Sequence, residues 1–178
     1  MNIRKAQKAD ISSIETIFEE VHGEEESGRV TIGWQRGIYP TRATAEAALE
    51  RDDIFVLESG GEILGAAVIN QLQVDVYAEG KWRHPAGADE VMVLHTLVIS
   101  PAAGRRGLGR YFVSFYEEYA RQKGCLCLRI DTNERNVNAR ALYKKLGYEE
   151  IGIVPCVFNG LEGVNLVLLE KYLGTELL

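Results

Sequence analysis

A Gly- and Arg-rich loop, Pro101–Phe112 ("PAAGRRGLGRYF"), carries residues whose types and spacing suit phosphate binding. It follows an apolar run and leads into a stretch with helical spacing, so it predicts the N-terminus of a helix. Such an end exposes unpaired backbone N–H groups and partial positive charge, and therefore binds anions. Gly107 and Gly109 leave room for a phosphate to approach the backbone. Positive charge comes from Arg105, Arg106 and Arg110. A flexible basic turn is the alternative for this loop.

The loop does not match the common nucleotide motifs. The GxxxxGK[ST] phosphate loop is absent, which excludes ATP or GTP hydrolysis by that route. The dinucleotide fingerprint needs a third glycine three residues after Gly109, where Phe112 stands. Its acidic residue at the end of the next strand is present as Asp131, so this alternative is weakened rather than eliminated. The preceding strands look antiparallel, which speaks against a dinucleotide fold.

A second motif lies downstream in "NERNVNARALYKKLGYEEIG". Together with "LVISPAAGRRGLGRYF" it resembles the GNAT superfamily of acyl-CoA-dependent N-acyltransferases. That family shows L-x-V-x-P at a strand end, [QR]-x-x-G-x-[GA] opening a helix, and N-x-x-A-x-x-x-Y-x-x-x-G-[FY] downstream. The resemblance covers residues 91–151. Gly104 departs from it, because it occupies the usual Gln/Arg position. The matching positions are Leu97 to Pro101 (with Ile99 for Val), Gly107, Gly109, Asn136, Ala139, Tyr143, Gly147 and Tyr148.

The resemblance implies acetyl-CoA as co-substrate and no metal. The pyrophosphate would lie on the loop's backbone N–H groups, and the pantetheine arm would pair like an added strand along the end of the preceding strand. Asn136 would reach the same arm, and a helix cap is the alternative role for it. The implied contact residues are Leu97, Val98, Ile99, Arg105, Arg106, Gly107, Leu108, Gly109, Arg110, Asn136, Ala139 and Tyr143.

Acyl transfer from a thioester to an amine needs a neutral amine, a polarised carbonyl and a protonated leaving thiolate. By resemblance, Tyr143 is the general acid near the sulfur, and packing in the core is the alternative. A backbone N–H near Leu97–Ile99 would hold the oxyanion. An alkyl ammonium has a pKa of about 10, so a base or a water chain must take its proton.

The candidate base is His95, four residues before Ile99. Some family members, such as the serotonin N-acetyltransferases, are similar in having a histidine there, and a hydrogen-bonded strand histidine is the alternative. Val93 occupies the position of the catalytic glutamate of other members and cannot serve. Glu90 and the cluster Glu24–Glu26 are weaker candidates, and such a cluster is more often a solvated loop face.

The acceptor is expected to enter between the first two helices and the loop around Trp82. Trp34, Tyr39 and Trp82 are candidates for the walls of its pocket, and Glu25 is a candidate for attracting an ammonium group. The leading hypothesis is acetyl transfer to a primary amine of a small molecule, by direct attack in a ternary complex. The alternatives are acetylation of a protein N-terminus or lysine, and a non-catalytic acyl-CoA sensor.

The elements that would position these residues form a mixed α/β domain spanning residues 1–178. The resemblance implies a mostly antiparallel sheet of about seven strands, splayed between the fourth and fifth, with about four flanking helices. Helices are expected from Asp10 to about Val21, from Thr41 or Thr44 to Arg51, and over 108–123 and 136–147. Strands are expected over 2–6, 53–59, 62–74, 90–100, 125–131, 148–158 and 164–172.

Composition limits the partners. The chain has a net charge of −6, with 46% apolar and 26% charged residues, which fits a globular protein and disfavours nucleic acid. It has neither a signal peptide nor an apolar run long enough for a membrane, so a cytoplasmic location is expected. The three cysteines, Cys125, Cys127 and Cys156, fit packed thiols in a reducing compartment. By analogy with relatives, "NLVLLEKYL" (165–173) is a candidate homodimer interface.

Overall fold

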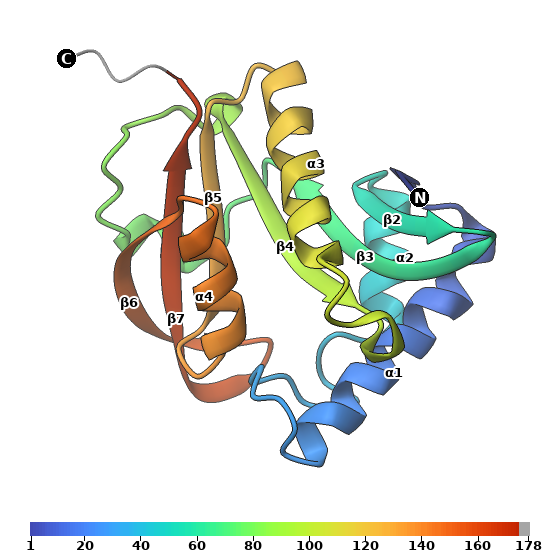
Figure 1. Cartoon of the computed structure of the whole chain (residues 1–178). Coiled ribbons are helices and arrows are strands. Elements are labelled where there is room, and N and C mark those ends of the chain that lie inside the picture. Colours follow the sequence, from blue (N-terminus) through green and yellow to red (C-terminus); the bar gives the residue numbers. More distant parts are fainter. Residues whose placement is uncertain (175–178) are drawn as a thin grey trace.

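The computed structural model describes residues 1–174 and contains a seven-stranded sheet in the order β1-β2-β3-β4-β5-β7-β6 (Figure 1). All neighbouring strands are antiparallel except β4 and β5. The strands are β1 (Asn2–Lys5), β2 (Ile54–Ser59), β3 (Glu62–Asn70), β4 (Val91–Ile99), β5 (Cys127–Asn133), β6 (Glu149–Phe158) and β7 (Leu161–Tyr172). The helices are α1 (Ile11–Glu26), α2 (Arg42–Glu50), α3 (Leu108–Gln122) and α4 (Val137–Lys145). The predicted mixed sheet with four flanking helices is confirmed.

Three apolar clusters hold the helices and loops on the sheet. Helices α3 and α4 pack on one face, over residues such as Leu94 and Ile130. On the other face, α1 and α2 cover β2, β3 and part of β4. The segment between β3 and β4 covers the β5–β7 part of that face through Tyr77, which is 3% exposed. No helix within residues 1–174 combines the length and apolarity needed to cross a bilayer.

The sheet splays open where β4 and β5 separate. Their pairing covers four residue pairs, from Val91 opposite Cys127 to Leu94 opposite Ile130. Beyond Leu94, β4 stays paired with β3 alone, through a bulge at which Thr96 takes a left-handed φ of 50°. Bulges bend a strand and increase its twist, so this one directs the end of β4 away from β5. His95 on β4 and Asp131 on β5 are the first residues beyond the last pair.

Two expectations from the sequence are wrong in detail. Helix α1 runs to Glu26, so the glutamates expected on a loop form its last turn. Glutamate has high helix propensity, and the helix ends only where Gly28 adopts a φ of 73°. The segment 165–173, a candidate dimer interface, belongs largely to β7, which lies between β5 and β6. Its residues Leu166 to Leu169 are at most 3% exposed because they form the core of this chain.

Candidate active site

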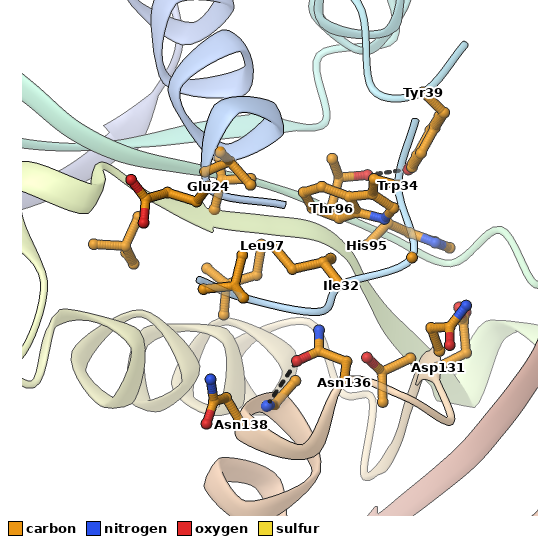
Figure 2. A pocket seen from close by; sticks show the side chains of 18 of the residues that line it. Glu24, Ile32, Trp34, Tyr39, His95, Thr96, Leu97, Asp131, Asn136 and Asn138 are labelled. Carbon is orange, nitrogen blue, oxygen red and sulfur yellow. Dashed lines mark hydrogen bonds between the residues drawn. The ribbon is translucent and has the colours of Figure 1, made fainter. Parts of the chain in front are cut away.

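A cavity of about 840 Å³ occupies the splay between β4 and β5 (Figure 2). This volume is in the range of pockets that hold small molecules and cofactors. Its walls come from the ends of β4 and β5, the start of α4, the segment after α1 and the β6–β7 turn. Of the residues predicted from the sequence, the cavity brings together Trp34, Tyr39, His95, Leu97, Val98, Ile99, Arg105, Asn136, Ala139 and Tyr143.

The splay leaves one edge of β4 available to a ligand. Since β5 pairs only as far as Leu94, the edge of Leu97–Ile99 that faces β5 has no strand partner. Asn136 caps α4, because its Oδ1 accepts a hydrogen bond from the N–H of Ala139 at 3.1 Å. The amide nitrogen of Asn136 has no partner within residues 1–174, so the cap leaves it free to donate into the cavity. An amide-rich extended chain fits this edge.

Part of the Gly/Arg loop lines the cavity and part of it packs in the core. Arg105 reaches the cavity, with a φ of 62°, and Gly107 precedes α3 with a φ of 75°. Leu108 is 3% exposed and belongs to the core, and a Cβ on Gly109 would lie 3.3 Å from Leu142. These last two positions therefore serve packing of α3 against α4. Within the described part of the chain, no ion pair involves the loop arginines: Arg105, Arg106 and Arg110.

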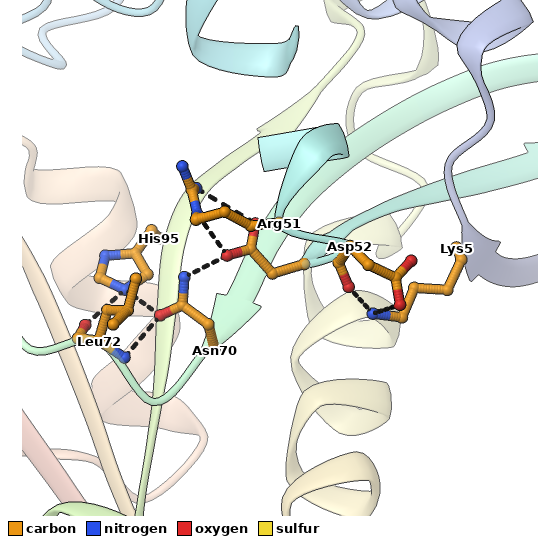
Figure 3. Close-up of polar contacts among 7 residues, drawn as sticks. Lys5, Arg51, Asp52, Asn70, Leu72 and His95 are labelled. Carbon is orange, nitrogen blue, oxygen red and sulfur yellow. Dashed lines mark hydrogen bonds and ion pairs between the residues drawn. The ribbon is translucent and has the colours of Figure 1, made fainter. Parts of the chain in front are cut away.

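The hydrogen bonds of His95 define its tautomer (Figure 3). Its Nε2 lies 3.0 Å from Oδ1 of Asn70 and 3.1 Å from the carbonyl oxygen of Leu72. The Asn70 amide nitrogen donates to the Asp53 carboxylate at 2.8 Å, so the oxygen of Asn70 faces His95. Both partners of Nε2 are acceptors, and Nε2 therefore carries the proton. The lone pair of the neutral ring is on Nδ1.

Burial lowers the pKa of His95 to about 4, although the carbonyl of Leu72 and the charge of Asp53 oppose this shift. The imidazole is therefore neutral at pH 7, and its Nδ1 can accept a hydrogen bond without first losing a proton. His95 lines the cavity. The other positions considered for the base are less suited. Glu90 accepts a hydrogen bond from the N–H of Gly87 on the exposed turn before β4, outside the cavity, and Val93 is fully buried.

Replacing Asn70 tests this hydrogen-bond arrangement. In Asn70→Ala, the ring of His95 loses one of its two acceptors and keeps only the Leu72 carbonyl, so its orientation is held less firmly and we expect kcat to decrease about tenfold. Nitrogen-15 NMR of the imidazole reports the tautomer directly and should show the proton on Nε2 in the wild-type protein. Gln71→Ala is the matched control, since the Gln71 side chain contacts Asp89 and Cys125 and not His95. A wild-type imidazole that carries its proton on Nδ1 contradicts the assignment.

Tyr143 projects from α4 into the cavity and is 6% exposed. Burial raises the pKa of its phenol, and the nearby charge of Asp131 raises it further. Its ring packs edge-on against Tyr148 at 5.8 Å between centroids. The core packing considered as an alternative is thus present, together with access to the cavity. The phenol keeps its proton at neutral pH and can donate it.

Asp131 is a cavity residue that the sequence suggested only as part of a nucleotide-binding fingerprint. One of its oxygens accepts a hydrogen bond from the Tyr77 hydroxyl at 2.8 Å. Burial raises the pKa of the Asp131 carboxyl to about 6, although the Tyr77 bond acts in the opposite direction. A signal was present in the sequence: an acidic residue ends a strand that is otherwise mostly apolar, at the point where the splay was expected.

The residues expected at the acceptor divide into two groups. Trp34 and Tyr39 line the cavity with their ring centroids 6.0 Å apart, and Tyr39 packs edge-on against Phe158 at 5.3 Å. Trp82 lies outside the cavity walls, where its ring covers the Arg129 guanidinium at 3.9 Å. The carboxylate of Glu25 accepts hydrogen bonds from the backbone N–H groups of residues 32 and 33. Glu25 therefore shapes the loop that lines the cavity.

Gly33 allows this loop to approach β5. It has a φ of 84°, and a Cβ there would lie 2.3 Å from the amide nitrogen of Asn133. We expect Gly33→Ala to displace the loop and to raise the acceptor KM about tenfold. Gly37→Ala is the control, because Gly37 also has a positive φ, 75°, and a Cβ there would meet nothing within 4 Å. Both variants carry the backbone cost of about 1 kcal/mol, so an equal effect on KM contradicts the steric explanation.

Comparison with known proteins extends these observations. A model of the acetyltransferase (GNAT) family matches residues 14–148. The uncharacterized N-acetyltransferase YhfO of Bacillus subtilis is 29% identical over 152 residues, covering 84% of this chain and 91% of YhfO. The structure of Salmonella typhimurium yncA with its cofactor acetyl-CoA has a TM-score of 0.70 at 21% identity, covering 100% of this chain and 96% of that one. The ribosomal-protein-alanine N-acetyltransferase of Brucella melitensis also has a TM-score of 0.70 at 21% identity, covering 97% and 99%.

The two solved structures share the fold at this level of identity. The family match is more specific, because it spans most of the chain and includes β4, the Gly/Arg loop and α4. These are the elements that surround the cavity in the splay. The chain belongs to the GNAT acetyltransferase family.

Proposed function

We propose that this acetyltransferase transfers the acetyl group of acetyl-CoA to a primary amine of a small molecule, by direct attack in a ternary complex. The observation that carries the proposal is the convergence of three features on one cavity. These are the unpaired edge of Leu97–Ile99, the protonated phenol of Tyr143 and the neutral imidazole of His95.

The residues on the donor side fit acetyl-CoA, which supplies a thioester carbonyl when bound. The unpaired β4 edge and the free amide nitrogen of Asn136 suit the amides of a pantetheine arm. The pyrophosphate would be held by the loop that precedes α3, where backbone N–H groups combine with the unpaired charges of Arg105, Arg106 and Arg110. The missing side chain at Gly104 is offset by these neighbouring arginines.

The roles of the protein groups follow from their protonation. A backbone N–H of Leu97–Ile99 stabilises the carbonyl oxygen as it gains negative charge. His95 accepts a hydrogen bond from the amine at Nδ1 and passes the proton to water, since a group with a pKa of about 4 does not retain it. Tyr143 donates its proton to the departing sulfur. No metal enters this scheme.

The walls of the cavity favour a small acceptor over a protein. Trp34 and Tyr39 on the segment after α1, and Phe158 beside the β6–β7 turn, enclose the side of the splay that His95 lines. A folded protein would have to insert an extended terminus between these rings.

Release of free CoA from acetyl-CoA, measured over a panel of amines and N-terminal peptides, tests the proposal. We expect turnover with small primary amines and little with peptides. The reverse preference would support a protein acetyltransferase, and binding of acetyl-CoA with no turnover on any acceptor would support a sensor. Failure to bind acetyl-CoA would refute the assignment of the donor.

A further inference from the structure

We propose that Asp131 is the anionic subsite for the ammonium group of the acceptor, and that the acceptor is a small cationic amine carrying an aromatic or similarly flat apolar group. The inference rests on the proposed function and specifies its substrate class. It concerns the side of the cavity opposite the Gly/Arg loop, where Asp131, Trp34, Tyr39 and His95 lie together in Figure 2.

Within residues 1–174, only one of the two carboxylate oxygens of Asp131 has a hydrogen-bond partner. Tyr77 donates a hydrogen bond to Oδ1 at 2.8 Å, and within residues 1–174 no other hydrogen bond and no ion pair reaches the Asp131 side chain. The residue is partly accessible and lines the cavity. A carboxylate withdrawn from bulk water is costly unless a cation or several donors compensate it. The free oxygen is therefore available to a ligand.

The groups around Asp131 do not neutralise it. Its charge raises the pKa values of four neighbours: the phenols of Tyr39, Tyr77 and Tyr143 and the thiol of Cys156. All four are uncharged at pH 7. His95, the histidine nearest along the splay, is neutral as well.

Arg129, two residues earlier on β5, is a cation near Tyr77. Its guanidinium is hydrogen-bonded to Gln73 and covered by the ring of Trp82, and within residues 1–174 no ion pair joins it to Asp131. A cationic ligand supplies the positive charge that the protein leaves out.

The position of Asp131 suits the amine that reacts. Ile130 is the last β5 residue paired with β4, opposite Leu94, so Asp131 and His95 come next on the two diverging strands. Tyr143 lines the same cavity as Asp131 and His95, and the charge of Asp131 raises the pKa of its phenol. An ammonium at Asp131 would thus share the cavity with the proposed proton acceptor and the proposed acid.

Aromatic rings form the rest of this subsite. Trp34, Tyr39 and Phe158 form a chain of edge-on contacts at 6.0 and 5.3 Å, and the Tyr39 hydroxyl is hydrogen-bonded to Thr96 at the bulge of β4. Flat apolar groups bury well against such rings, and a ring face also attracts an ammonium group. Together, the carboxylate and the rings favour an amine that carries an apolar group.

Glu24 is the other carboxylate lining the cavity, and it is a poorer anchor. It is paired with Arg29 at 2.8 Å and lies far from Asp131 in the view of Figure 2. Asp131, in contrast, is held by the protein in a fixed orientation. Trp82 donates a hydrogen bond to the carbonyl of Tyr77 at 2.7 Å and packs against its ring, and Tyr77 in turn holds Asp131.

Two acceptors of nearly equal shape distinguish the effect of the ligand's charge from the effect of its shape. 2-Phenylethylamine is an ammonium at pH 7.5, whereas O-benzylhydroxylamine is uncharged. In Asp131→Asn, which keeps the acceptor for Tyr77, we expect the KM for 2-phenylethylamine to rise about 100-fold. The KM for O-benzylhydroxylamine should change less than about threefold. Glu79→Gln is the control, because Glu79 is an exposed carboxylate on the same turn as Tyr77, outside the cavity.

Calorimetric binding of both compounds, in the presence of CoA, makes the test independent of turnover. Charge-dependent binding that disappears in Asp131→Asn supports the subsite even if acetylation is absent, in which case only the proposed function fails. Equal effects of Asp131→Asn on the two compounds overturn the subsite while acetylation stands. Failure of the wild-type protein to bind 2-phenylethylamine overturns the aromatic-amine class.

Discussion

Tyr143→Phe is expected to lower kcat by about 100- to 10,000-fold while leaving the affinity for acetyl-CoA nearly unchanged. The substitution removes one hydroxyl and keeps the ring that packs in the core, so the fold and the shape of the cavity are preserved. Burial raises the pKa of the phenol, which therefore carries a proton at neutral pH. Steady-state kinetics with a saturating amine, together with calorimetric binding of acetyl-CoA, separates the two effects.

Tyr148→Phe provides the matched control. Tyr148 packs against Tyr143 and is 2% exposed, and its hydroxyl is buried without a hydrogen-bond partner in the described part of the chain. Removal of that hydroxyl is expected to be neutral or slightly stabilising, with kcat unchanged. Similar losses of kcat in the two variants would assign Tyr143 a packing role instead of proton donation.

Asp131→Asn is expected to stabilise the ligand-free protein at pH 7.5 by up to about 3 kcal/mol. The pKa of this carboxyl is raised from 3.8 to about 6 in the folded state, so ionisation opposes folding. The penalty is absent well below pH 4, increases between the two pKa values and is complete above about pH 6. The stabilisation should therefore decrease to roughly half at pH 5. Urea unfolding at the two pH values measures it.

The charged and titratable groups that face Asp131 do not alter the sign of this effect. Tyr39, Tyr77, Tyr143 and Cys156 are all neutral over this range, and their own pKa values are raised by the carboxylate. Arg129, a cation two residues earlier on β5, is held by Gln73 and Trp82 and makes no ion pair with Asp131 within residues 1–174. Glu79→Gln controls for the loss of a negative charge from an acidic chain. A stabilisation that does not depend on pH would point to a packing effect of the amide. A more stable and less active variant is typical of functional positions.

The donor half of the proposed site could be inferred from the sequence because it depends on local backbone features that short stretches of sequence specify. Gly107 marks a positive φ before α3, and Asn136 is a helix cap whose identity follows from the orphan N–H groups of α4. Both lie within a few residues of the strand or helix that they serve. The spacing of the two motifs then fixes the loop and α4 on either side of the splay.

The acceptor half depends on contacts between distant segments. Tyr39 is hydrogen-bonded to Thr96 and Tyr77 to Asp131, and the residues of each pair lie more than 50 positions apart in the sequence. No local sequence pattern predicts these contacts. Trp82 was expected to wall the pocket because it is aromatic and lies in a polar loop. In the fold it covers Arg129 and supports Tyr77 instead. Residue type alone could not distinguish a ring that lines a cavity from one that packs behind it.

Because β4 and β5 are paired over only four residue pairs, a ligand bound between them can affect the stability of the protein. A ligand that spans the gap joins the β1–β4 half of the sheet to the β5–β7 half, so its binding free energy adds to the free energy of unfolding. At a ligand concentration 100 times Kd, this contribution is about 2.7 kcal/mol. We therefore expect unfolding and proteolysis to slow when the proposed donor is bound across this gap.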